Sequence, residues 1–147
     1  MKEVSELIEH LNLEQLEDCL FRGKSEDVGS KSVFGGQVLA QALNAAQSTV
    51  DAGRIAHSLH GYFILPGDLN APIVFQVTKV RDGGSFSTRN VRAIQHGKAI
   101  FTLMASFQLK QDGFEHQIEM PKVRQPEELF SDRDLFEKIK DNIPESF

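Results

Sequence analysis

One uncharged segment with helical character stands out in the middle of the first half of the chain. From Gln37 to Thr49 the sequence QVLAQALNAAQST contains no Gly, Pro, Asp, Glu, Lys or Arg. Its apolar side chains cover most of the circumference of a helix: Val38, Leu39, Ala40, Ala42, Leu43, Ala45 and Ala46. A helix on a protein surface carries charged or polar residues on its solvent face. The pattern therefore predicts a helix that is surrounded by protein.

Two short helices are predicted before this segment. The apolar residues of the first recur at helical spacing, namely Val4, Leu7, Ile8 and Leu11. Asn12 followed by Gln15 resembles a capping box, which would start a second helix. That second helix would carry Leu13, Leu16 and Leu20.

The hydrophobic period changes from about 3.6 to 2 after the long helix, which predicts four strands. The expected strands cover residues 57–65, 73–80, 86–94 and 99–108. Turn residues separate them, namely Pro66-Gly67-Asp68, Asp82-Gly83-Gly84 and His96-Gly97, the last as a tight hairpin turn. In the first strand, His57, Leu59, Phe63 and Leu65 share one face, and Ser58, His60 and Tyr62 share the other. The last strand alternates most cleanly, with Ala99, Phe101, Leu103, Ala105 and Phe107 on one side.

These elements predict an α+β protein with the hot-dog fold. Each strand has one apolar face, and only the long helix is apolar enough to fill the concave side of an antiparallel sheet. We expect this domain to span residues 1–121. Residues 122–147 are polar and acidic and are expected to form a linker or tail, in which Ser131 with Asp134 would cap a short helix. That helix would carry Leu135, Phe136, Ile139 and Ile143.

The composition of the chain limits the kinds of molecule that it is expected to bind and the compartment in which it is expected to occur. The formal charge of -5 argues against broad binding to nucleic acid or to an anionic membrane surface. The single cysteine, Cys19, excludes an internal disulfide and a Cys-rich zinc site, so we expect a protein of a reducing compartment, the cytoplasm. No signal-peptide pattern is visible, and no apolar run approaches the roughly 18 to 20 residues that cross a bilayer.

Several stretches of the sequence together resemble the type II acyl-CoA thioesterases, in order and in spacing. They are Leu20-Phe21-Arg22-Gly23, Val33-Phe34-Gly35-Gly36-Gln37-Val38, His57-Ser58-Leu59-His60-Gly61-Tyr62-Phe63, Leu65-Pro66-Gly67-Asp68, Arg81-Asp82-Gly83, Ser85-Phe86-Ser87-Thr88-Arg89 and Ala105-Ser106-Phe107-Gln108. The resemblance covers roughly residues 10 to 121. The combination of FGGQ with HSxHxYFxxPGD at this separation is specific, whereas either motif alone is weak.

The resemblance implies two hot-dog domains in tandem, of which this chain is the N-terminal one. It also implies hydrolysis of medium- to long-chain fatty acyl-CoA to fatty acid and CoA, without metal or cofactor. In this family the Asp, Thr or Ser, and Gln that position water and polarise the thioester belong to the second hot-dog. The expected partners are therefore acyl-CoA, a C-terminal hot-dog half and further copies of the protein, with neither nucleic acid nor membrane.

Candidate site residues lie at the start of the long helix and along two strands. Gly35, Gly36 and Gln37 are candidates for substrate binding, because backbone N–H groups at a helix N-terminus can approach a carbonyl oxygen. The glycines could equally serve a tight turn and close packing. His57 is a candidate general base, or else a hydrogen-bonded and partly buried histidine. Gln108 resembles the counterpart of the catalytic Gln of the second half, or else an exposed amide at a strand end.

The sequence leaves open the role of the basic residues and the choice among three functions. Binding of CoA phosphates calls for Lys or Arg near the entrance, and the candidates are Arg81, Arg89, Arg92 and Lys98, which could equally form a solvated face. Ser85, Ser87 and Thr88 form no nucleophile motif. Three functions are consistent with the sequence: half of an acyl-CoA thioesterase, a non-catalytic acyl-CoA-binding or regulatory module, and a single hot-dog hydrolase with a rebuilt site that uses His57.

Overall fold

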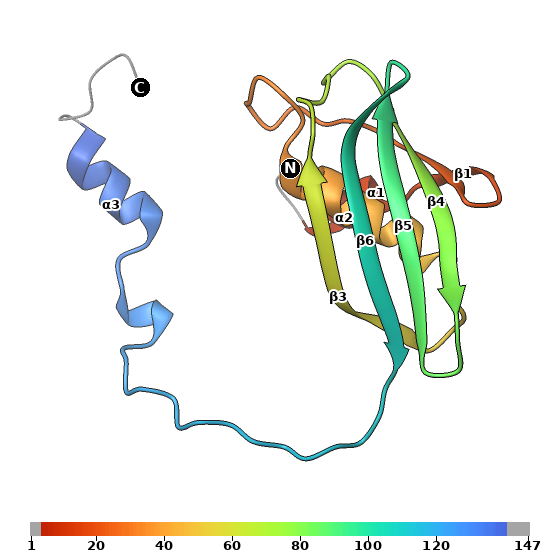
Figure 1. Ribbon diagram of the computed structural model, residues 1–147. Helices are drawn as coiled ribbons and strands as arrows, with labels where there is room; N and C mark the ends of the chain where they lie inside the picture. The colour runs from red at the N-terminus through yellow and green to blue at the C-terminus, as the bar shows by residue number, and fades with distance from the viewer. Residues whose placement is uncertain (1–3, 141–147) are drawn as a thin grey trace. The chain divides into compact units, whose positions relative to one another are not determined.

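The computed structural model describes residues 4–140, and six strands of this range form one antiparallel sheet (Figure 1). The strands are β1 (Glu14–Glu17), β2 (Leu20–Gly23), β3 (Arg54–Phe63), β4 (Ile73–Asp82), β5 (Phe86–Gln95) and β6 (Lys98–Leu109). Their order across the sheet is β1-β2-β4-β5-β6-β3. The four strands predicted from period-2 alternation are confirmed, and each is one to three residues longer at an end than expected, except that β3 ends two residues earlier.

The helix α2 (Gly35–Gln47) packs against the inner face of this sheet (Figure 1). The sheet side chains that it covers are almost fully excluded from water: Ile73, Phe75, Val91, Ala93, Phe101, Leu103, Ala105 and Phe107. These residues alternate along each strand as the sequence predicts, because only every second side chain of a strand faces the helix. The α+β hot-dog arrangement is confirmed.

The burial of α2 is less complete than predicted. Leu39, Ala40 and Leu43 are only half-buried, although both leucines pack against the core, so the described residues do not wholly surround the helix. Two amide side chains of α2 bond to the preceding chain: the buried Gln41 donates to the carbonyls of His10 and Lys24, and the half-buried Asn44 donates to the carbonyl of Leu11. These bonds hold α1 (Val4–Leu11) and the chain around Lys24 against the helix.

A β-hairpin replaces the predicted second helix, so that prediction is wrong. β1 and β2 pair with each other, and β2 continues the main sheet by pairing with β4. Cys19 turns the chain with a φ of 61°, a left-handed conformation that a helix interior cannot contain. Pairing with β4 also buries Phe21 in the core, which gives the segment a tertiary reason to be a strand.

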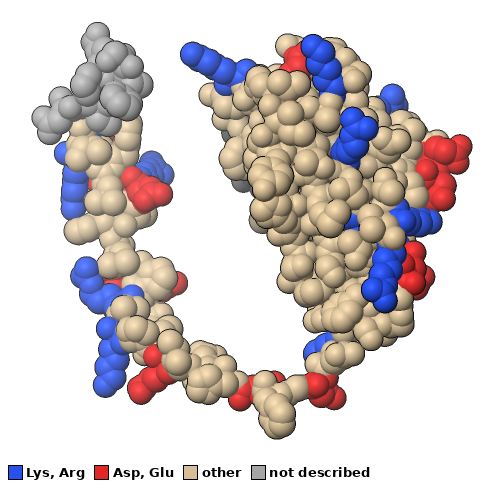
Figure 2. Space-filling view, viewed as in Figure 1, with Lys and Arg blue, Asp and Glu red and all other residues tan. Residues whose placement is uncertain are grey.

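β3 forms one edge of the sheet, with β6 on one side and no described strand on the other. The hairpin strands β5 and β6 both lie inside the sheet. Apolar side chains along and just after β3 are exposed: Ile55, Leu59, Tyr62, Phe63, Ile64 and Leu65. No Lys, Arg, Asp or Glu follows Arg54 on β3 or Lys98 on β6, and much of the face seen in Figure 2 is uncharged.

A second compact unit begins at Gly113, after the sheet has ended at Leu109. It contains a short 3-10 helix, η1 (Pro126–Glu128), and the helix α3 (Asp132–Ile139). Ser131 and Asp134 form the predicted capping box of α3, with reciprocal side chain to backbone bonds. Ile143, which the prediction assigned to the same helix, lies outside the described residues. Among the helices of residues 4–140, none is long and apolar enough to cross a membrane.

Candidate functional site

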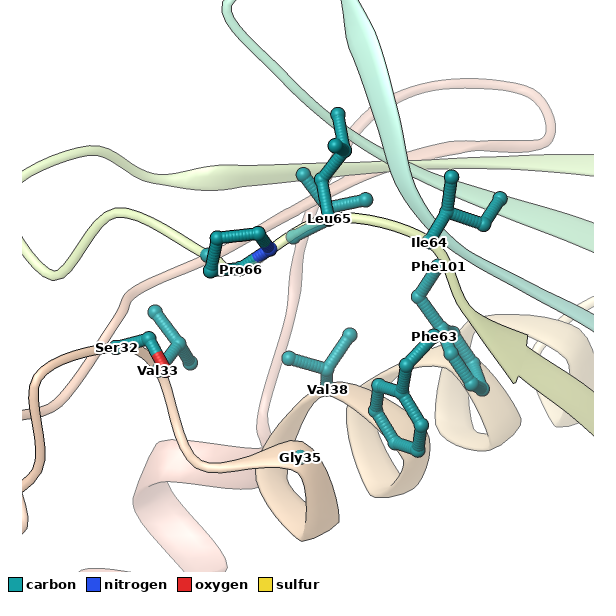
Figure 3. Close-up of a pocket in the computed structure, with 11 residues that line it drawn as sticks. Ser32, Val33, Gly35, Val38, Phe63, Ile64, Leu65, Pro66 and Phe101 are labelled. Atoms are coloured by element: carbon teal, nitrogen blue, oxygen red, sulfur yellow. The ribbon is translucent and has the colours of Figure 1, made fainter.

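A cleft of about 390 Å³ opens where α2 begins (Figure 3). Its walls are the chain entering α2, the first turn of the helix, the segment that follows β3, and the start of β6. The lining residues are Ser32, Val33, Gly35, Val38, Phe63, Ile64, Leu65, Pro66, Gly67, Ile100 and Phe101. Two parts of the chain that resemble the thioesterase motifs, FGGQ and PGD, therefore meet at one place.

Aromatic rings lie directly against the two glycines that open α2. A Cβ atom on Gly35 would lie 3.0 Å from the Phe63 ring, and one on Gly36 would lie 2.5 Å from the ring of Phe34. The absence of side chains at both positions thus allows the rings to approach the helix backbone closely. Phe34 is also the N-cap of α2 and makes no side-chain capping bond.

The loop that forms the outer wall is fixed by a buried amide. The Gln95 side chain accepts from the backbone N–H of Asp68 at 2.8 Å and donates to the carbonyls of Asp68 and Ala71. The backbone N–H of Asn70 and the His96 ring, 2.9 Å from the carboxylate, hold the pKa of Asp68 below its usual range. The N–H of Val33 donates to the carbonyl of Gly67, which joins the two walls.

Sequence reasoning missed Gln95, although a signal for it exists. Alternation along β5 places Gln95 on the inner face with Val91 and Ala93, where an amide without partners would be costly. A polar residue in such a position indicates a specific set of hydrogen bonds. Here those bonds shape the cleft.

Gln37 does not line the cleft, although it follows the two glycines directly. Its amide nitrogen donates to the carbonyl of Lys24 at 2.9 Å, and its oxygen accepts from the backbone N–H of Glu26. It is also within 3.4 Å of the Gln41 side chain. The amide of Gln37 therefore joins the polar contacts that hold the chain before α2.

His57 lies on the opposite face of the sheet from the cleft, and the predicted alternation is wrong at this position. A β-bulge between Ala56 and Ser58 shifts the register, so His57 leaves the face that carries Leu59. Its Nε2 lies 2.8 Å from the Ser106 hydroxyl, and its ring centroid is 5.4 Å from that of Phe86. His57 is hydrogen-bonded as expected, but it is exposed rather than partly buried.

Gln108 does not line the cleft. It is half-buried near the end of β6, opposite Ile55 on one side and Phe86 on the other. Alternation with buried Phe107 places its side chain on the outer face. Of the candidate residues, Gly35 therefore lines the cleft, Gly36 and Gln37 follow it on α2 without lining it, and the side chains of His57 and Gln108 lie on the outer face of the sheet.

Arg89 is not available to bind CoA phosphates in this chain, which corrects one of the basic candidates. It is 1% exposed, and its guanidinium donates to the hydroxyl and the carbonyl of Thr49 and to the carboxylate of Asp82. This contact, at 2.7 Å, lowers the pKa of Asp82. Arg81, Arg92 and Lys98 are exposed.

The chain belongs to the family of acyl-CoA thioesterase N-terminal domains, whose model matches residues 22–108. This match includes both walls of the cleft and the strands β4, β5 and nearly all of β6.

Among its relatives is acyl-CoA thioesterase 2 of Haemophilus influenzae, 45% identical over 142 residues, which are 97% of this chain and 50% of the relative. The crystal structure of the acyl-CoA thioesterase II TesB2 from Mycobacterium marinum is similar, with a TM-score of 0.73, 49% identity and coverage of 82% of this chain and 45% of that one. A hot-dog-fold protein from Alicyclobacillus acidocaldarius has a TM-score of 0.69 at 27% identity, over 81% of this chain and 46% of that chain. The chain thus spans about half the length of each of these relatives.

Proposed function

We propose that this chain is the N-terminal hot-dog half of an acyl-CoA thioesterase that hydrolyses medium- to long-chain fatty acyl-CoA to free fatty acid and CoA. The observation that carries the proposal is the family match together with its extent: the chain matches an N-terminal domain and spans half of relatives named as acyl-CoA thioesterases. The open edge at β3 supports it, because an exposed strand edge with apolar side chains favours pairing with another sheet.

In this proposal the groups that activate water come from the other half. Thioester hydrolysis needs an activated water and donors aimed at the carbonyl oxygen. α2 contains no carboxylate, and Ser32 is the only residue with a polar side chain among the described residues that line the cleft. The cleft can therefore hold an apolar part of a substrate, with Gly35 at its wall, but it offers no general base.

The exposed basic residues are the remaining candidates for CoA. Arg81, Arg92 and Lys98 are solvent-exposed on β4, β5 and β6. We assign them no phosphate contact, because none of them lines the cleft.

A test of the proposal replaces the N-terminal half of the Haemophilus influenzae relative by this chain. The chimera should hydrolyse acyl-CoA, measured as released thiol, whereas this chain alone and the isolated C-terminal half should show little or no turnover. A chimera that folds and assembles but has no activity would contradict the proposal.

Two other functions are distinguished by the same measurements. A non-catalytic acyl-CoA-binding module would bind substrate in the chimera without releasing thiol. The hydrogen bond between His57 and Ser106 is the observation that favours a single hot-dog hydrolase. In that case the chain alone would turn over acyl-CoA, and His57→Ala would abolish the activity. Under our proposal, His57→Ala leaves turnover of the chimera largely unchanged, because the His57 side chain lies on the face of the sheet opposite the cleft.

A further inference from the structure

We propose that the cleft at the start of α2 binds the methyl end of a straight acyl chain, and that Phe63 determines how long a chain it accepts. The inference deepens the proposed function, because it names the part of the substrate that this half would hold. It concerns binding alone and requires no catalytic group.

The chemistry of the walls selects an apolar ligand. Of the eleven residues that line the cleft, none carries a charged side chain, and the side chains of Val33, Val38 and Ile100 are buried against the core. A volume of about 390 Å³ is near the lower end of the range of ligand sites, which runs from about 300 to 1,000 Å³. The phosphates of a CoA headgroup find no Lys or Arg on these walls, whereas a hydrocarbon tail needs none.

The position of the cleft explains how a tail would reach it. Phe63 is the last residue of β3, the edge strand, so the cleft begins where the sheet has no described partner. A second hot-dog that pairs along this edge would place its own residues beside Phe63. An acyl chain held at a thioester site in that partner could then extend across the edge into the cleft.

Phe63 is held in place by contacts on two sides. Its ring centroid lies 4.7 Å from that of Phe101, and its ring lies over Gly35, where a Cβ atom would come within 3.0 Å. Gly61 permits this arrangement, because a Cβ there would lie 2.7 Å from the Phe101 ring. Phe63 is nevertheless 59% exposed, so its ring is a wall of the cleft rather than part of the core. Its removal should enlarge the cleft with little loss of folding stability.

The experiment measures binding of saturated fatty acids to the full chain, below their aggregation concentrations. The probes are octanoate, decanoate, dodecanoate, tetradecanoate and hexadecanoate, and the readout is the NMR shift of labelled Val, Ile and Leu methyl groups. The methyl groups of Val33, Val38, Ile64, Leu65 and Ile100 should shift, and those of Ile55 and Val80 should not. Affinity should rise roughly fourfold per added methylene until the cleft is full, as expected for burial of apolar surface.

Matched variants test the role of Phe63. Phe63→Ala should allow affinity to rise for at least one longer acid than in the unaltered chain. Phe86→Ala is the control, because Phe86 is also a half-exposed strand phenylalanine but lies away from the cleft. Leu65→Glu, at an exposed wall position, should weaken binding at least tenfold while leaving the circular dichroism spectrum unchanged. If Phe63→Ala fails to fold, Phe63→Leu provides the smaller enlargement.

Three results would overturn the inference: no methyl shifts with any acid, shifts centred outside the cleft, or a length dependence that is the same in Phe63→Ala and Phe86→Ala. These outcomes are independent of hydrolysis in the chimera. Binding without a working chimera would therefore leave the cleft assignment intact and remove only the proposed enzyme.

Discussion

Two arginines of β5 differ in burial and therefore in their contribution to the fold. Arg89 and Arg92 are three residues apart, yet Arg89 lies on the inner face and Arg92 on the outer face. The guanidinium of Arg89 bonds to Thr49, just after α2, and to Arg81 and Asp82 at the end of β4, and so joins these two parts of the chain. A charge this deeply buried needs such partners, since its desolvation would otherwise be very costly.

Arg89→Met should therefore destabilise the domain by about 1–3 kcal/mol, because partly buried acceptors such as the Thr49 carbonyl lose their donor. Arg92→Met is the matched control, and its effect should stay within about 0.5 kcal/mol, as for most surface changes. Urea titrations of both variants measure the difference. Equal effects of the two substitutions would mean that the contacts of Arg89 contribute nothing net to folding.

The sequence predicted only some of the site residues correctly, and individual residues show why. The FGGQ and PGD motifs pointed to the region that forms the cleft. His57 was assigned to the wrong face because a β-bulge breaks the alternation, and nothing in the local sequence specifies that bulge. Arg89 and Gln95 alternate in step with Val91 and Ala93 along β5, and this pattern would have identified both as buried.

At the level of elements, the period of the hydrophobic residues and the positions of turn residues predicted most of the sheet and its central helix. The hairpin turn at His96-Gly97 is confirmed, with a positive φ at both residues. The β1–β2 hairpin was missed because residues 13–20 carry leucines at helical spacing, and its strand character depends on pairing with β4, which is distant in sequence. Local pattern cannot reveal a strand that is stabilised by tertiary contacts.

Core residues of the sheet under α2 should contribute more to stability than the half-buried leucines of the helix itself. Leu103 on β6 is 1% exposed in the core under the helix, so Leu103→Ala should cost about 2–5 kcal/mol. Leu43 is half-buried on α2, so Leu43→Ala should cost less, about 1–2 kcal/mol, because a smaller area returns to water. Denaturant titrations of the two variants provide the comparison. A cost for Leu43→Ala equal to that for Leu103→Ala would show that other parts of the protein cover this side of the helix.

At the scale of the whole molecule, the edge of the hot-dog unit at β3 has no partner strand among the described residues. No Lys, Arg, Asp or Glu follows Arg54 on β3 or Lys98 on β6, and β3 exposes Leu59 and Tyr62. Proteins protect exposed strand edges by charges, bulges or partners, because free backbone N–H and C=O groups pair readily with another strand. β3 has one bulge, at His57, and no Lys, Arg, Asp or Glu after Arg54. A partner strand is therefore the expected protection.

The chain in isolation should accordingly form a homodimer that substitutes for the pair of hot-dog halves. Leu59→Lys places a charge in the middle of the edge strand and should convert the dimer to a monomer, since a Lys on an edge strand opposes pairing. Val80→Lys is the matched control, because Val80 is also exposed and apolar but lies on β4, inside the sheet. Sedimentation velocity over a range of concentrations should show dimers for the unaltered chain and for Val80→Lys. Persistence of the dimer in Leu59→Lys would locate the association elsewhere, and a monomeric unaltered chain would show that β3 does not pair with a second copy.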